Sequence, residues 1–274
     1  MHSTDPHVVE IMDVSSDIRT VWRAWADPGW LSAWMAERVE GPIVPGGEVA
    51  WRWDSLGLAL DLEVTACEPP HRFSLRGGAP GRPAQTQTVS LAEIPGGTRI
   101  HLTHGEFGPG AGDERDGTAA GWRVMLRVLA HYLAGRAGRR RECAAVLAPV
   151  IASLRAVGEL LHDPDRRAAW LTDGETPALG EGEPYQLRFA GGAALSGRVI
   201  AVAPPFELAL GWEEVDGVLV LRAIQIAPGG PVLACCQAWS WAPERDAWRS
   251  ARATLEGAVA RLVAAAGGAT GGAA

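Results

Sequence analysis

The sequence contains no lysine, and all 25 of its basic residues are arginines. This absence excludes a lysine Schiff base and a Walker-type phosphate loop, because both need a lysine ammonium group. The arginines do not make the chain basic, since 32 acidic residues leave a net charge of -7. Nucleic acid is therefore not an expected partner, because its binding needs clustered positive charge.

Cysteines are few, and long hydrophobic runs are absent. The cysteines, at positions 67, 143, 235 and 236, lack C-x-x-C spacing, so neither a disulfide framework nor a metal site is expected. No apolar run approaches the roughly 18 residues of a membrane-spanning helix, and no signal-peptide pattern is visible. No nucleotide-binding or hydrolase motif precedes a suitable helix. We therefore expect a cytoplasmic chain without membrane insertion, metal or cofactor; the oligomeric state is open.

An internal repeat is the main positive feature. Residues 14–34 and 150–170 align without a gap at an offset of 136, so that Asp27-Pro28 falls on Asp163-Pro164 and Trp34 on Trp170. Further on, Pro69-Pro70 matches Pro204-Pro205, and Pro95-Gly96-Gly97 matches Pro228-Gly229-Gly230 at an offset of 133. Such ordered landmarks indicate a duplicated domain. We expect one domain over residues 1–138 and a second over 139–274, with a disordered Gly/Ala tail from about residue 266.

The first copy has a legible order of elements. Periodicity predicts a strand over 8–14, a helix over 17–25 capped by Asp17, and a short helix that begins at Asp27-Pro28. Period-two alternation then predicts an antiparallel sheet with one wet face. Its strands are expected over 49–54, 58–67, 72–76, 89–91 and 98–104. A long helix over 117–133 is the element expected to cover the apolar face, with space left between helix and sheet.

The start of the second copy allows two interpretations. Residues 142–161 form either a strand followed by a helix, as in the first copy, or one long helix broken at Pro149. The matching frame favours the strand and helix. The last helix of this copy is expected to carry Trp248, Leu255, Val259 and Leu262.

Five stretches of the first copy occur in an order known from one protein superfamily. They are VWRAWADPGWLSAWM at 21–35, GGEVAWRW at 46–53, LEVTACEPPHRFSL at 62–75, GGTRIHLTHGEF at 96–107 and GWRVMLRVLAHYL at 121–133. This set resembles the SRPBCC (START/Bet v 1-like) superfamily, in the branch related to the Hsp90-ATPase activator domain. The resemblance implies an α+β fold: two tandem helix-grip domains, each a curved antiparallel sheet wrapped around a long C-terminal helix and enclosing a cavity.

The resemblance also implies function classes. Members bind lipids, polyketides, hormones or other apolar ligands, some act as aromatase/cyclases, and a few in enediyne antibiotic clusters are ligand-binding or self-sacrifice resistance proteins. We expect a non-catalytic protein that binds a hydrophobic, polyketide- or enediyne-like small molecule in a biosynthetic or self-resistance role. The alternatives are a cyclase that uses His104 or Arg52 to promote enolisation, and a chaperone-regulating interaction module.

Candidate ligand-binding residues follow from the abundance of tryptophan, with 12 Trp against 4 Phe and 2 Tyr. Indole rings give a flat apolar lining and fixed N–H donors, or they simply fill a core. His104 shares a strand face with Ile100 and Leu102 and could orient a ligand or act as a weak base. The first-copy set is Trp25, Trp30, Trp51, Trp53, Leu60, Phe73, Leu102, His104, Trp122, Met125 and Leu129. The second-copy set is Tyr185, Phe189, Trp212, Gln237 and Trp239, with Gln237 as the expected counterpart of His104.

Overall fold

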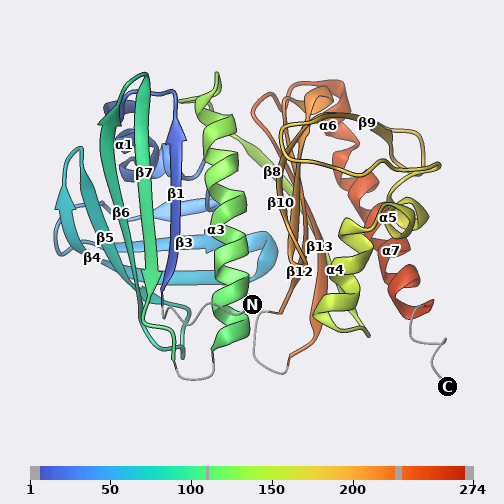
Figure 1. Ribbon diagram of the computed structural model, residues 1–274, viewed down its shortest axis with the longest axis horizontal. Coiled ribbons are helices and arrows are strands. Elements are labelled where there is room, and N and C mark those ends of the chain that lie inside the picture. Colours follow the sequence, from blue (N-terminus) through green and yellow to red (C-terminus); the bar gives the residue numbers. More distant parts are fainter. Residues whose placement is uncertain (1–6, 109–110, 226–229, 269–274) are drawn as a thin grey trace. The chain divides into compact units, whose positions relative to one another are not determined.

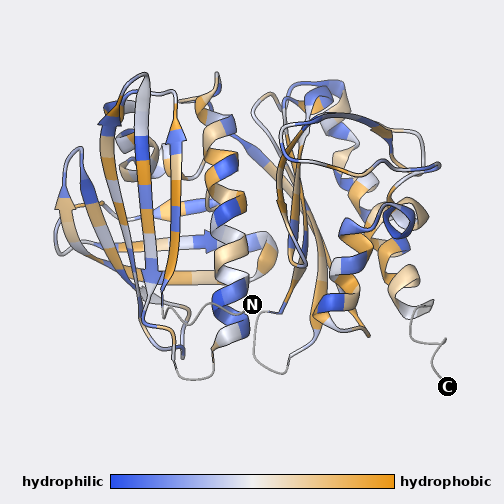
Figure 2. Ribbon diagram, in the orientation of Figure 1, coloured by the Kyte–Doolittle hydropathy of each residue, from blue (hydrophilic) through white to orange (hydrophobic). Residues whose placement is uncertain are grey.

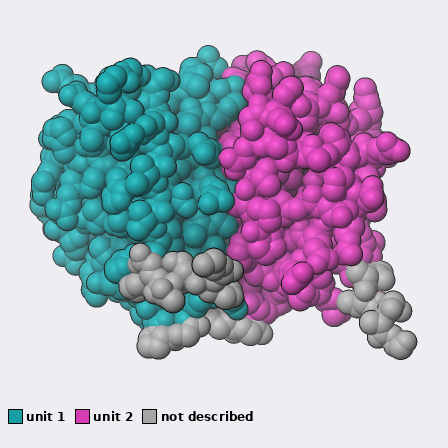
Figure 3. Space-filling view, viewed as in Figure 1, with its two compact units in different colours: residues 1–140 teal, residues 141–274 magenta. Residues whose placement is uncertain are grey.

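The computed structural model describes residues 7–108, 111–225 and 230–268 of the chain (Figure 1). It divides into two compact units, residues 1–140 and 141–274 (Figure 3). Each unit has a strand, two helices, a run of antiparallel strands and a C-terminal helix, so each is an α+β helix-grip domain, as the sequence predicts. No helix within the described ranges is long and apolar enough to cross a membrane.

The first unit is one seven-stranded sheet with three helices. Its elements are β1 (Val8–Val14), α1 (Ile18–Ala26), α2 (Pro28–Leu31), β2 (Arg38–Glu40), β3 (Glu48–Trp53), the 3-10 turn η1 (Asp54–Leu56), β4 (Leu58–Glu68), β5 (Arg72–Gly78), β6 (Gln85–Ile94), β7 (Gly97–Gly105) and α3 (Gly112–Leu133). The strand order is β1-β7-β6-β5-β4-β3-β2, with every pair antiparallel. The first strand therefore pairs with the last, and Val8 lies opposite His104.

The second unit repeats this plan with six strands. Its elements are β8 (Glu142–Val150), α4 (Leu154–His162), α5 (Pro164–Leu171), β9 (Pro184–Arg188), β10 (Ala194–Ala203), β11 (Glu207–Trp212), the 3-10 turn η2 (Glu213–Val215), β12 (Gly217–Ile224), β13 (Val232–Ser240), α6 (Asp246–Arg249) and α7 (Ala251–Gly268). The order is β8-β13-β12-β11-β10-β9. The strand-then-helix interpretation of residues 142–161 is confirmed.

Side-chain caps fix where the short helices begin. The Asp17 carboxylate accepts hydrogen bonds from the backbone amides of Arg19 and Thr20, both at 3.0 Å. At the equivalent position of the second unit, Ser153 accepts one from the amide of Ala156 at 3.1 Å. These groups satisfy amides that have no partner inside the helix. The predicted cap at Asp17 is confirmed.

The two units share a buried tryptophan that pins one helix to the next. In the first unit Trp34 Nε1 donates to the carbonyl of Ala24 at 2.9 Å, and in the second Trp170 Nε1 donates to the carbonyl of Leu160 at 2.8 Å. Both rings are fully buried. The same hydrogen bond at the same offset shows that the repeat in the sequence is a repeat in three dimensions.

Some boundaries differ from the sequence expectations. The three-residue strand β2 has too few residues to show alternation and was not predicted. Helix α3 begins five residues earlier than expected, at Gly112, so the charged run 113–116 is its first turn. The last helix of the second unit is divided at Ser250 into α6 and α7. Helix α7 reaches Gly268, so residues 266–268 are helical; residues 269–274 of the predicted tail lie outside the described residues.

The strands of the two sheets differ in how many of their faces are buried. In the first unit, apolar and polar residues alternate along the strands, which appears as bands along β7 (Figure 2). In the second unit every residue of β11 is buried, and β12 is buried on both faces except at its last residue. Strands of this second kind read as continuous apolar runs, so alternation cannot show which side chain faces the helices.

Candidate functional site

A strip of polar side chains crosses the inner face of the first sheet. Gln85 and Gln87 project from β6 in phase with the buried residues Val89 and Leu91, and Gln87 lies directly opposite His104 on β7. Helix α3 adds Trp122, whose ring is 6.2 Å from that of His104. Polar groups are rare in such an interior unless they are hydrogen-bonded or functional.

A directed chain of hydrogen bonds runs along this strip. Trp122 Nε1 lies 2.9 Å from His104 Nδ1, and His104 Nε2 lies 2.8 Å from Gln85 Oε1. An indole N–H can only donate, so Nδ1 accepts, and the imidazole proton therefore sits on Nε2 and is donated to Gln85. Gln85 Nε2 in turn donates to Glu114 Oε1 at 3.1 Å, and Arg82 contacts the other oxygen of Glu114 at 2.7 Å.

His104 is held neutral by its surroundings. Burial lowers its pKa from the usual 6.5 to about 4, because the charged form loses its hydration. One ring nitrogen already carries the proton, and the other accepts from Trp122. The lone pair that a general base needs is therefore occupied in this state.

Packed aromatic rings surround the strip. Trp25 of α1 lies edge-on to Trp34 at 4.7 Å, and its ring is 5.8 Å from Phe73 and 6.1 Å from Trp122. Edge-to-face contacts at such distances stabilise the cluster beyond the apolar area that it buries. The cluster makes this interior apolar and tightly packed around Trp25.

Three polar atoms of this interior lack a hydrogen-bond partner among the described residues. They are Nε1 of Trp25, Nε1 of Trp51 and Oε1 of Gln87. The residues are 0%, 1% and 5% exposed. Buried donors and acceptors are nearly always paired in folded proteins, so each such atom calls for an explanation, of which a bound molecule is one.

Most predicted residues of the first copy lie in this interior, but two lie apart from it. The buried members are Trp25, Trp51, Trp53, Phe73, Leu102, His104, Trp122, Met125 and Leu129. Leu60 is partly exposed. Trp30, also partly exposed, lies under the Arg23 guanidinium at 4.6 Å and edge-on to Tyr132. We therefore place Trp30 and Leu60 at the margin of the site.

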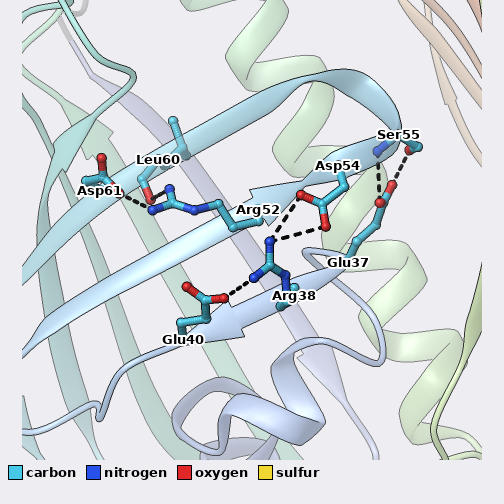
Figure 4. Close-up of polar contacts among 8 residues, drawn as sticks. All are labelled: Glu37, Arg38, Glu40, Arg52, Asp54, Ser55, Leu60 and Asp61. Atoms are coloured by element: carbon cyan, nitrogen blue, oxygen red, sulfur yellow. Dashed lines mark hydrogen bonds and ion pairs between the residues drawn. The ribbon is translucent and has the colours of Figure 1, made fainter.

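Arg52 does not face the interior, which removes it as a candidate for promoting enolisation. It projects from the outer face of β3, donates to Asp61 at 2.6 Å and approaches the carbonyl of Leu60 at 3.4 Å (Figure 4). Beside it, Arg38 contacts Glu40 and Asp54. Arg52 follows Trp51 in the strand, so its side chain points the other way.

A polar groove of about 510 Å³ follows this outer face. Its charged lining residues are Glu40, Glu48, Arg52, Asp61, Glu63 and Arg76. Such a lining does not suit an apolar ligand, and the groove is separate from the aromatic interior.

The predicted second pocket is divided between two faces of its sheet. Tyr185, Phe189 and Trp212 belong to the hydrophobic core of the second unit. Gln237 and Trp239 do not, because the residues of β13 in that core are Val232, Ala234, Cys236 and Ala238. Placing Gln237 and Trp239 inside the pocket was therefore wrong.

The sheet registers show how this error arose. Val14 pairs with Thr98, and its repeat Val150 pairs with Val232, so the offset along this strand is 134. The counterpart of His104 is then Ala238 rather than Gln237. The expected offset of 133 came from the Pro-Gly-Gly landmark, of which Pro228 and Gly229 lie outside the described residues. A slip of one residue moves a side chain to the opposite face.

Gln237 instead joins a buried polar cluster on that opposite face. Arg222 donates to Glu207 at 3.0 Å and to the side-chain oxygen of Gln237 at 2.6 Å, and the Gln237 amide nitrogen lies 3.5 Å from Cys143 Sγ. The side chains of Arg222 and Glu207 are each 9% exposed. Burial lowers the pKa of Arg222, but Glu207, Cys235 and Cys143 together outweigh burial, so the pKa lies above its usual value.

Sequence reasoning missed Gln85 and Gln87. Their signal was present, because both continue the two-residue spacing of Val89 and Leu91 toward the start of the strand. A polar residue in the inward phase of a strand marks either a strand end or a functional interior.

Comparison with known proteins identifies the first unit. Residues 15–134 match the family model described as Activator of Hsp90 ATPase homolog 1-like protein, AHSA1. The first unit is an AHSA1-like domain. The predicted resemblance to this branch of the SRPBCC superfamily is thereby confirmed for the first unit, and the match covers both strands of the polar strip and helix α3.

Solved structures with a similar arrangement include two that resemble one AHSA1-like domain. CalU16 from Micromonospora echinospora is 21% identical, over 47% of this chain and 76% of its own, with a TM-score of 0.41. The Aha1 dimer from Colwellia psychrerythraea is 18% identical, over 47% and 98%, with a TM-score of 0.44. DynU16, described as a putative protein in the dynemicin biosynthetic locus, is 19% identical over 96% of this chain and 99% of its own, with a TM-score of 0.45. No curated protein matches the chain.

Proposed function

We propose that the AHSA1-like first unit binds a hydrophobic small molecule in its aromatic interior and does not transform it. The observation that carries the proposal is the set of three unpartnered buried atoms, on Trp25, Trp51 and Gln87. A folded core tolerates an unpaired buried group at a cost of about 1–3 kcal/mol. A ligand that supplies the missing partners would offset that cost, while the aromatic walls exclude water from it.

The second unit supports this assignment by contrast. In sheet register, the position of Gln87 is taken by Leu219, and that of His104 by Ala238. The polar side chains in its hydrophobic core have partners within the unit: Tyr185 bonds to the carbonyl of Gly211, and Trp212 donates to that of Ala194 at 3.0 Å. The second unit also has unpartnered buried atoms, such as Nε1 of Trp239, but these residues lie outside its hydrophobic core, whereas the three named above for the first unit lie in the aromatic interior.

The cyclase alternative is not favoured by the geometry. It requires an acid–base pair that converges on the substrate. Arg52 lies on the outer face, and both nitrogens of His104 are engaged by Trp122 and Gln85. Binding without catalysis remains the better account of the same residues.

The ligand class is the finer part of the proposal. The sequence resemblance points to a polyketide- or enediyne-like natural product, held in a biosynthetic or self-resistance role. Burial of apolar ligand surface would supply about 25 cal/mol per Å² toward affinity. The interior hydrogen-bonding groups would orient the ligand.

A titration of the full chain with the tricyclic ketone 9-fluorenone, followed by calorimetry, tests binding. We expect saturation at one ligand per chain. Gln87→Phe should weaken binding at least about tenfold, because the larger ring fills the space that the ligand needs. Leu219→Phe, the matched change in the second unit, should leave the affinity unchanged. Absence of saturable binding, or equal loss in both variants, would contradict the proposal.

A second candidate is a chaperone-regulating interaction module, which the description of the matched family favours. It predicts that the chain raises the ATPase rate of a purified Hsp90. An unchanged rate at saturating chain concentration would remove this candidate without affecting the first.

A further inference from the structure

We infer that the ligand of the first unit is an uncharged, flat molecule that carries acceptor oxygens and at least one donor. This inference rests on the proposed function and specifies its ligand. It follows from the identity of the three unpartnered atoms, from the polar groups beside them and from the shape of the walls.

The unpartnered atoms define which hydrogen bonds are missing. Nε1 of Trp25 and Nε1 of Trp51 are indole N–H groups, which can only donate. A ligand completes them with acceptor oxygens such as carbonyls. Oε1 of Gln87 is an amide carbonyl and needs a donor, such as a hydroxyl group. A ligand that completes these hydrogen bonds therefore needs two acceptor atoms and one donor.

Not every indole of the first unit is open in this way. Trp34 donates to the carbonyl of Ala24, Trp53 to that of Met35 at 3.3 Å, and Trp122 to His104. The protein therefore supplies a hydrogen-bond acceptor for the N–H groups of three buried tryptophans of the first unit, but not for those of the other two. This division separates structural rings from those that can recognise a ligand, although all five are buried.

The inward-facing members of the polar strip carry no charge, and Glu114, at the exposed end of the hydrogen-bond chain, is already paired with Arg82. The inward-facing members are the amides of Gln85 and Gln87, the indole of Trp122 and the imidazole of His104, which is neutral at physiological pH. A carboxylate or ammonium group buried against these side chains would lose its hydration without gaining an opposite charge, which is costly. The strip therefore selects against ionised ligands.

The walls favour a flat ligand. Rings of Trp25, Trp34, Phe73 and Trp122 form a chain of contacts with centroid separations of 4.7 to 6.1 Å. Aromatic rings pack well against other flat π-systems, edge-on or offset. A planar oxygenated polycycle satisfies the walls and the open donors together.

Four probes of one shape test this inference by calorimetry: 9-fluorenone, fluorene, 9-fluorenol and 9-fluorenone-2-carboxylate. The ketone keeps the tricycle and adds an acceptor, the alcohol adds a donor, and the carboxylate adds a charge. We expect fluorenone to bind at least about tenfold more tightly than fluorene, one completed buried hydrogen bond being worth about this factor. The carboxylate should bind more weakly than the ketone.

Three variants assign the preference to particular atoms. Trp51→Phe should reduce the ratio of fluorenone to fluorene affinity toward one while leaving the fluorene affinity within about twofold, because only the N–H is lost. Gln87→Leu should remove any advantage of fluorenol over fluorenone. Trp34→Phe is the matched control, because its N–H is already bound to Ala24, and the ratio should persist.

The outcomes separate this inference from the proposed function. If fluorene binds as tightly as fluorenone, or if Trp51→Phe and Trp34→Phe change the ratio equally, the acceptor requirement is wrong while apolar binding stands. If the carboxylate binds as tightly as the ketone, the requirement for an uncharged ligand is wrong. If no probe binds, the proposed function itself fails.

Discussion

The indole N–H of Trp122 ends on Nδ1 of His104 at 2.9 Å, and this contact fixes the tautomer of a buried imidazole. To become charged, His104 would have to lose this hydrogen bond or turn its ring. The interaction therefore adds to burial in keeping the side chain neutral.

The stability of the chain should depend on pH through His104. Burial lowers the pKa of His104 from 6.5 to about 4, so between these values the unfolded chain binds a proton that the folded chain does not. The resulting contribution is fully present above pH 6.5 and is lost as the pH falls toward 4. It amounts to about 3 kcal/mol at 1.36 kcal/mol per pKa unit. Urea unfolding at pH values from 7 to 4.5 should show a smaller decline in His104→Gln than in the wild type.

Part of the pH dependence should remain in that variant. Burial and the nearby Arg167 also lower the pKa of His162 in the second unit to about 4. The free energy of unfolding of the double variant His104→Gln/His162→Gln should therefore change less with pH than that of either single variant. Identical slopes in all four proteins would contradict both assignments.

The buried hydrogen bonds of Trp34 and Trp170 should stabilise their units by similar amounts. Trp34→Phe removes the hydrogen bond to Ala24, and Trp170→Phe removes that to Leu160, while most of each ring remains. Each change leaves a buried carbonyl with one partner fewer, and we expect a loss of about 1–3 kcal/mol. Thermal unfolding by calorimetry measures it. A negligible effect at either position would show that the shared pin is not a stabilising device.

Arg222 and Glu207, the buried ion pair of the second unit, should depend on each other for stability. Arg222→Met removes the cation and leaves Glu207, with its side chain 9% exposed, without its charge partner. We expect a loss of about 3–5 kcal/mol in the free energy of unfolding. Arg222→Met combined with Glu207→Leu should recover most of it, because both charges then leave the interior. A double variant no more stable than the single one would mean that the packing of Arg222, rather than its charge, matters.

Gly158 should not tolerate a side chain. A Cβ at this position of α4 would lie 2.2 Å from the carbonyl oxygen of Pro205, which is backbone and cannot move aside cheaply. Gly158→Ala should therefore destabilise the second unit, although alanine favours a helix by about 1 kcal/mol. Gly257→Ala in α7 is the control, since its Cβ would meet only the flexible end of Arg261 at 3.3 Å. In melts followed by circular dichroism, the midpoint temperature should fall for Gly158→Ala and rise or stay the same for Gly257→Ala.

The sequence predicted the first unit better than the second for a physical reason. Strands such as β7 have one dry face, so alternation assigned His104 and Leu102 to the interior correctly. Strand β13 is buried on both faces over most of its length, so alternation carried no information, and a landmark in a loop gave the wrong phase for Gln237. Loops change length more easily than paired strands, which makes strand register the better guide.

The chemistry of the site was only partly visible in the sequence. Periodicity showed that Trp51 and His104 face inward, but not which indole N–H groups find a carbonyl. That depends on chain segments that are remote in sequence, as where Trp53 reaches Met35. The distinction between open and satisfied tryptophans therefore needs coordinates.

In each sheet the first strand of the unit pairs with the last, and this pairing has a consequence for folding during synthesis. Val8 pairs with His104, and in the second unit Glu142 pairs with Ser240, so each first strand waits for a partner almost a whole unit later. Contacts of such high sequence separation form slowly, and an unpaired strand is exposed until they do. All strands of the first sheet precede residue 141, so they leave the ribosome before the strands of the second sheet. The nascent chain thus presents one unfinished sheet at a time, which limits pairing between the repeats.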